Sequence, residues 1–314
     1  MILLFSSLFF IFGLAVGSFL NVVAYRSVHG DPKRPELKKP QRSSLEKISS
    51  VLFGHSVCPK CRHQLSALDL VPILSYVILK GRCRTCRKKI SLQYPIVEFA
   101  TGLLFAFTFY HWYQTTSFQF PVTSGQANSG LWSLVSGPWS LAAGNLIYLI
   151  YLLFVISVLI VLFTTDIVDN LLPNSIVLPA IAVVIIYKLL LSLFSPPPFF
   201  SLSSLLPFLT DFAASFLVAS IFFAIVYLSR ERALGGGDVK LVFLISLVVG
   251  WPSLLVALWL AFLTGGAVAV MLILLGKKRF GQTVPLGPFL ALGALVAMFY
   301  GNEIIRWYLS TLAG

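Results

Sequence analysis

GNLIYLIYLLFVISVLIVLFTTD, residues 144–166, decides the fold of this chain. Residues 144–165 are predominantly apolar and long enough to cross about 30 Å of hydrocarbon as a helix. Comparable runs lie at about 1–25, 95–113, 175–194, 211–229, 239–251, 253–275 and 284–309. None shows the strict alternation of a membrane β-barrel strand. The sequence therefore predicts an all-α polytopic protein with about eight transmembrane helices in a lipid bilayer.

The composition excludes a water-soluble protein. Of the 314 residues, 58% are hydrophobic and 11% are charged, and the mean hydropathy is +0.91. Fifteen of the 23 Lys and Arg residues lie between Arg26 and Lys89. Because they are not spread over an aromatic-studded groove, we expect no nucleic acid partner. We predict three parts: a first transmembrane helix at 1–25, a basic insert at 26–94 and a transmembrane domain at 95–314.

The same charges predict an orientation. Basic loops stay in the cytosol, so the insert is expected there and both termini outside. Arg230 to Lys240 and Lys277 to Arg279 then also fall inside, whereas segments 114–143 and 195–210 fall outside and carry no cation. The first run could instead be a cleaved signal peptide, but it lacks a basic n-region and a small-residue cleavage site. The predicted location is a bacterial inner membrane, crossed several times.

All four cysteines lie in the insert, as two CxxC pairs. Cys58 and Cys61 are separated by 21 residues from Cys83 and Cys86, a spacing typical of a structural zinc site with four thiolate ligands. Surrounding Lys and Arg residues favour the thiolate form. Two disulfides, unliganded thiols and redox chemistry are the alternatives, and a reducing cytosol disfavours disulfides. His55 and His63 could replace a ligand, although four cysteines already suffice.

Acidic residues in or against the predicted helices are few, and a carboxylate at membrane depth by default marks function. They are Glu98, Asp166, Asp169, Asp211, Asp238 and Glu303. Asp166 ends a helix that runs from outside to inside, and Asp238 begins one that returns. Both carboxylates are therefore expected near the inner face, where neighbouring helices would let them share one proton. Such a pair provides a general base and a general acid for hydrolysis of a peptide bond.

Asp238 follows Gly235, Gly236 and Gly237, which we predict to form the active-site loop. Glycines allow close approach of another segment and positive φ angles. Simpler explanations remain for each carboxylate. Asp238 could only cap its helix, and Asp166 or Asp169 could cap the next helix or form an Asx-turn before Pro173. No histidine lies near the pair in the sequence to suggest a serine-histidine-aspartate site.

Five elements in order resemble the type IV prepilin peptidase family, membrane aspartic proteases of the GxGD type. They are Gly17 to Arg26 (GSFLNVVAYR), the cysteine region from Cys58 to Glu98, Asp166 with Leu171-Leu172-Pro173-Asn174, Gly235 to Leu241 (GGGDVKL), and Pro285 to Phe289 (PLGPF). The resemblance identifies Asp166 and Asp238 as catalytic. Asn174 stands where the family usually shows Asp, and Val168 occupies a position that is often acidic.

The resemblance implies cleavage of the basic leader of prepilins or pseudopilins on the cytosolic side. It also implies N-methylation of the new terminus with S-adenosylmethionine, for which no binding site can be located by spacing. Two other functions remain possible from the residues. The aspartates could serve a proton- or cation-coupled transporter, or the insert could dock anionic lipid or an acidic partner.

Overall fold

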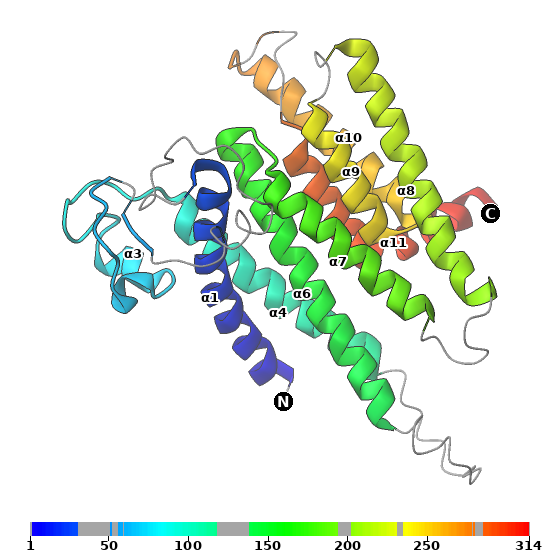
Figure 1. Cartoon of the computed structure of the whole chain (residues 1–314), viewed down its shortest axis with the longest axis horizontal. Coiled ribbons are helices and arrows are strands. Elements are labelled where there is room, and N and C mark those ends of the chain that lie inside the picture. The colour runs from blue at the N-terminus through cyan, green and yellow to red at the C-terminus, as the bar shows by residue number, and fades with distance from the viewer. Residues whose placement is uncertain are drawn as a thin grey trace, which may run out of the picture. The chain divides into compact units, whose positions relative to one another are not determined.

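The computed structural model describes residues 2–30, 51, 56–58, 60–117, 138–193, 202–230, 235–277, 279 and 285–313. Eight long helices account for most of them: α1 (Ile2–His29), α4 (Gln93–Ser117), α6 (Pro138–Asp169), α7 (Asn174–Leu193), α8 (Leu202–Ser229), α9 (Gly236–Val249), α10 (Ser253–Leu274) and α11 (Gly287–Ala313). Each corresponds to one predicted helix, so the all-α prediction is confirmed (Figure 1).

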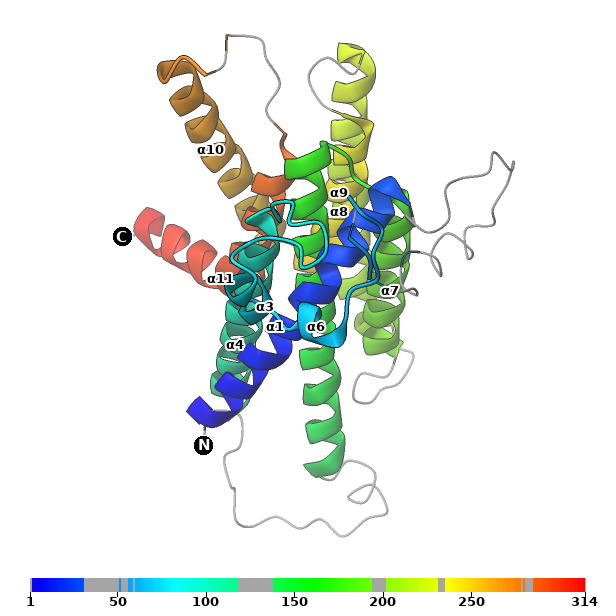
Figure 2. The ribbon, with the colours of Figure 1, turned by 90° about the vertical axis from the view of Figure 1, so that its left-hand side faces the viewer.

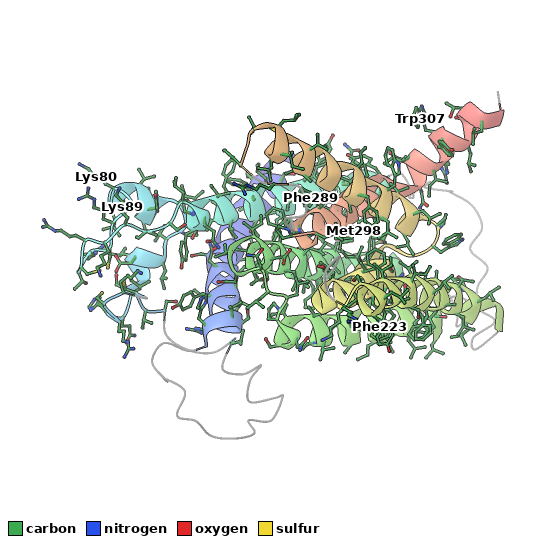
Figure 3. The ribbon with its side chains drawn as sticks, turned by 90° about the horizontal axis from the view of Figure 1, so that it is seen from above. Lys80, Lys89, Phe223, Phe289, Met298 and Trp307 are labelled. Atoms are coloured by element: carbon green, nitrogen blue, oxygen red, sulfur yellow. The ribbon has the colours of Figure 1, made fainter. Side chains whose placement is uncertain are left out.

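Six of these helices are long and apolar enough to cross a membrane by their length and composition: α1, α6, α7, α8, α10 and α11. Large apolar side chains cover their outer surfaces, as Figure 3 shows for Phe223 on α8. Among the described helices, α4 and α9 do not meet both conditions. At 14 residues, α9 is the shortest of the eight, although it is one of the most deeply buried.

The chain forms two compact units. The first contains α1 up to Val23, the later part of the insert with η1 (Ala67–Leu70) and α3 (Leu74–Ile78), α4, and α6 up to Ile160. In it, α1 packs closely on α4: a Cβ built at Gly13 would lie 2.8 Å from the Cα of Gly102. Phe9 and Phe109 stack across the same interface with ring centroids 4.5 Å apart. Small residues thus let two aromatic-rich helices approach each other.

The second unit contains the ends of α1 and α6 together with α7 to α11. Its core is α9, which packs against α7, α8, α10 and α11, and Figures 1 and 2 both show it beside α8. Leu241, Leu244, Ile245 and Leu247 of α9 are all at most 1% exposed. A helix that is apolar on all sides belongs in the centre of a bundle, because every face must be buried. Asp238 is therefore carried by the central helix of this unit.

Candidate active site and candidate metal centre

Asp166 lies one turn before the end of α6, after the buried Thr164 and Thr165. The helix ends where Asn170 adopts a left-handed conformation with φ +51°, and its N–H donates to the carbonyl of Asp166 at 3.1 Å. Asparagine is one of the few residues that tolerate this C-terminal conformation. Because Asp166 is only 6% exposed, its carboxylate is held inside the second unit.

The backbone of Gly287 lies directly against this carboxylate. A Cβ built at Gly287 would come 2.5 Å from Oδ2 and 2.9 Å from Cγ of Asp166. Any side chain at position 287 would therefore displace the carboxyl group. The Pro285 to Phe289 element contributes this glycine, and the sequence alone gave no reason to place it beside Asp166.

Asp238 is the third residue of α9, and its carboxylate bonds back to the start of the helix. Gly235 donates its N–H to Oδ2 of Asp238 at 3.2 Å. The capping interpretation is thus partly right, since Asp238 does satisfy a free N–H at this helix end. This bond occupies Oδ2 and leaves Oδ1 of Asp238 available for proton transfer.

The structure corrects one reason given for the three glycines. Positive φ angles occur at Gly30, Gly81, Gly250 and Gly276, and not at the glycines before Asp238; Gly235 has φ −79°. At one of these positions, glycine is needed because another segment of the chain approaches closely. A Cβ at Gly237 would lie 3.3 Å from two carbons of Leu172, which precedes α7.

Asp166 and Asp238 are close enough for their charges to repel each other. Two more contacts fix the segments that carry them. Leu172, in the loop after α6, meets Gly237, and Lys240 of α9 donates from Nζ to Oδ1 of Asn174 at 2.8 Å. The loop that follows Asp166 is therefore attached twice to the beginning of α9, and the two predicted carboxylates come together at one end of the second unit.

The other acidic residues have different partners. Asp169 lies 3.5 Å from Nε2 of His29, and Asp211 accepts Nζ of Lys188 at 2.6 Å and the Trp251 N–H at 2.8 Å. Glu303 is exposed on α11, while Glu98 is buried in the first unit. Neither Asp169 nor Asp211 therefore takes the place of Asp166 or Asp238.

The four cysteines form one cluster in the insert. The sulfur atoms of Cys58, Cys61, Cys83 and Cys86 all lie within 4.8 Å of one another, and Cys58 and Cys86 approach to 4.0 Å. All four are free thiols rather than disulfides. Tetrahedral zinc with Zn–S bonds of about 2.3 Å places its sulfurs about 3.8 Å apart, so the cluster has nearly the required size. His63 is exposed, and His55 lies outside the described residues.

The two CxxC pairs adopt the same backbone fold. Cys58 N–H donates to the carbonyl of His63, and Cys83 N–H donates to that of Lys88, both at 2.9 Å. Four residues after each first cysteine, Arg62 and Arg87 have φ of +57° and +54°. The N–H groups of Cys86 and Thr85 donate to the Cys83 sulfur, which lowers the pKa of this thiol to about 7. Both loops thus present two sulfurs from a tight turn, as a metal knuckle requires.

Exposed lysines lie in the same part of the chain, and Figure 3 shows Lys80 and Lys89 projecting from the insert. Fold and sites together define a polytopic helical membrane protein with a pair of aspartates, of which Asp166 is buried, and a four-cysteine centre. Comparison of the sequence with protein-family profiles narrows this class to one family. Residues 11–112 match the "Bacterial Peptidase A24 N-terminal domain" and residues 152–270 match the "Type IV leader peptidase family". The chain belongs to the type IV leader peptidase family.

Curated relatives cover nearly the whole chain. A "Prepilin leader peptidase/N-methyltransferase" of Aeromonas salmonicida is 30% identical over 98% of this chain and 95% of its own length. Proteins with the same description from Aeromonas hydrophila and Bacillus subtilis are 30% and 28% identical, and each alignment covers 98% of this chain and at least 94% of the relative. No solved structure shows a significant match.

Proposed function

We propose that this protein is a membrane-embedded aspartic endopeptidase that removes the basic leader of prepilins or pseudopilins. The observation that carries the proposal is that the segments bearing Asp166 and Asp238 meet at one end of the second unit, where Leu172 packs on Gly237 and Lys240 donates to Asn174. The descriptions of the relatives support the substrate class. They give no support to the transporter alternative.

The arrangement supplies both proton transfers that hydrolysis needs. Two like charges at close range cannot both be ionised easily, so the pair shares one proton. The ionised carboxylate takes a proton from water, which attacks the peptide carbonyl, while the protonated partner donates to the carbonyl oxygen. Collapse of the tetrahedral intermediate breaks the C–N bond and passes a proton to the leaving amine. No covalent bond to the enzyme forms.

A cleavage assay with isosteric variants tests these roles. Purified protein is incubated with a prepilin peptide, and loss of the leader is followed by mass spectrometry. Asp166→Asn and Asp238→Asn should each reduce cleavage by at least 10³-fold, since either change removes one proton-transfer group. Glu303→Gln, which removes an exposed carboxylate of α11, should cleave like the wild type. Retained cleavage in either aspartate variant would exclude that residue from catalysis.

The N-terminal domain match and the relatives' descriptions support a second activity, methylation of the newly exposed amine with S-adenosylmethionine as the methyl donor. We also propose that the four cysteines bind one structural Zn²⁺. A metal would stabilise an insert whose described residues include few buried apolar side chains. Elemental analysis should give about one zinc per chain, and Cys83→Ser should lower this ratio and the insert's resistance to proteolysis.

The concentration of Lys and Arg in the insert supports a cytosolic location for the cysteine centre, with both termini outside. In that orientation the leader, which is also basic, remains on the side where it is synthesised. Labelling of single cysteines introduced at the two termini by a membrane-impermeant reagent tests this orientation. Both should react in intact spheroplasts, whereas a cysteine introduced at Lys80 should react only after lysis.

A further inference from the structure

A polar layer lies between α1 and α4 in the first unit, and it contains none of the residues proposed for peptide hydrolysis. A Cβ at Gly17 would lie 2.8 Å from the Cα of Glu98. One turn along each helix, Asn21 donates from Nδ2 to the carbonyl of Tyr94 at 3.1 Å. The antiparallel helices therefore place Asn21 and Glu98 one turn apart on facing surfaces.

Glu98 is 7% exposed, and the insert contributes one of its partners. The N–H of Ile73 donates to Oε2 of Glu98 at 2.7 Å. Ile73 has φ +58° and ψ −49°, and Leu74 N–H donates to the Pro72 carbonyl two residues back at 2.5 Å. This is a γ-turn, a strained conformation for a β-branched residue. Such strain persists where surrounding contacts enforce it, and it is concentrated at functional sites.

Asn21 has an acceptor that the described residues do not satisfy. The residue is 3% exposed, and its Oδ1 is buried without a hydrogen-bond partner. A buried amide oxygen without a donor costs free energy, so such an atom in a native structure calls for an explanation. A ligand that brings an N–H or O–H donor would remove this cost. The adjacent carboxylate makes a positively charged donor the best match.

We infer that Asn21 and Glu98 bind the N-terminal amine that receives the methyl group. The inference rests on the proposed function, because leader cleavage is what creates a free α-amino group. A protonated amine carries three N–H donors and one positive charge, which match the free Oδ1 of Asn21 and the carboxylate of Glu98. The Ile73 N–H holds that carboxylate in place.

The two side chains then have distinct roles in methyl transfer. S-adenosylmethionine, when bound, supplies a methyl group on a positively charged sulfur. Glu98 accepts one proton from the ammonium group, which frees the nitrogen lone pair, and Asn21 holds a remaining N–H. The nitrogen forms the new N–C bond as the S–C bond breaks, and that electron pair stays on sulfur. The proton on Glu98 passes to water, so charge and atoms balance.

The first experiment measures cleavage and methylation of one substrate molecule by mass spectrometry. The full-length protein is given a prepilin peptide and S-adenosylmethionine. Glu98→Gln keeps an oxygen for the Ile73 N–H but replaces the charge with an amide, and Asn21→Leu removes Oδ1 at similar volume. Both should still remove the leader, because neither belongs to the peptidase pair, while the methylated fraction falls at least tenfold. Thr108→Val, which removes another buried hydroxyl of α4, is the control and should change neither activity.

The second experiment measures amine recognition without methyl transfer. A fluorescent peptide with the sequence of the cleaved product is bound with a free or an acetylated N-terminus, in the absence of methyl donor. The wild type should bind the free amine at least tenfold more tightly, and Glu98→Gln and Asn21→Leu should abolish this preference. If both variants still prefer the free amine as strongly as the wild type, the polar layer only holds the two helices together. The same conclusion follows if both variants lose cleavage together with thermal stability. Absence of wild-type cleavage would instead refute the proposed function, and the amine preference would still test this site.

Discussion

The main chain at Gly287 packs directly against the carboxylate of Asp166. A Cβ built at Gly287 would lie 2.5 Å from Oδ2 of Asp166, so there is no space for even a methyl group. We expect Gly287→Ala to displace the Asp166 carboxylate and to reduce leader cleavage at least tenfold while the protein still folds. Gly266→Ala on α10 is the matched control, because a Cβ there meets nothing within 4 Å. Equal cleavage by both variants would mean that Asp166 can move without loss of activity.

Lys240 connects the loop after Asp166 to α9 through Asn174. Lys240→Met removes this bond and should lower kcat for cleavage several-fold, because both aspartates depend on the spacing of these segments. Asn174→Asp converts the bond to an exposed ion pair and should raise stability by less than about 1 kcal/mol. A double-mutant cycle with Asn174→Ala and Lys240→Met, followed by kinetics, checks the connection. Fully additive effects of the two substitutions on kcat would show that the contact carries no energy.

Asp211 joins three helices at the opposite end of α9 from Asp238. Its carboxylate binds Lys188 of α7 and the Trp251 N–H that follows α9, and the side chains of Lys188 and Asp211 are 17% and 20% exposed. Lys188→Met should lower the free energy of unfolding by about 2 kcal/mol, since it leaves a partly buried charge without its cation. Thermal unfolding in detergent measures this change.

Exchange of the two charges makes the test stricter. In Lys188→Asp/Asp211→Lys the ion pair can re-form, but the Trp251 N–H then faces an ammonium group. We therefore expect the exchange not to restore stability. Full restoration would assign the entire effect to the ion pair and none to the bond from Trp251.

Asp69 makes the stability of the insert depend on pH. The Ser66 hydroxyl, the Ser66 N–H and Arg84 lower the pKa of Asp69 below its usual value. Because the folded pKa is depressed, the stabilisation is present above the unfolded pKa of about 3.9 and is lost as the pH falls through the folded value. Asp69→Asn should thus be less stable than the wild type at pH 7, and the difference should shrink towards pH 3. Limited proteolysis of the insert across this range measures it; a constant difference would contradict the shift.

Several features could be predicted from the sequence because they depend on short segments. Apolar run length predicted every long helix, and the side on which each run ends predicted that Asp166 and Asp238 share an end. The repeated CxxC spacing predicted the four-cysteine cluster. Each of these patterns lies within a short segment, and the order and direction of the helices determine which segments end near each other.

Contacts between distant segments could not be predicted in this way. Nothing in the spacing of Gly287 indicates that it rests on Asp166, and the bond from Lys240 to Asn174 depends on how α7 packs against α9. The unsatisfied oxygen of Asn21 is visible only once its neighbours are known. For the three glycines before Asp238, the expected close approach is found at Gly237, which packs against Leu172, whereas the expected positive φ angles are not found.

The brevity of α9 has a consequence for where water enters. Fourteen residues at about 1.5 Å each span about 21 Å, roughly 9 Å less than a hydrocarbon layer of about 30 Å. If Gly250 lies at the far edge of that layer, the chain at Gly235 ends below the near headgroups, where main-chain N–H and carbonyl groups still require hydrogen-bond partners. A hydrated depression above Asp238 would let the attacking water molecule reach the carboxylates from the aqueous phase without crossing the hydrocarbon layer.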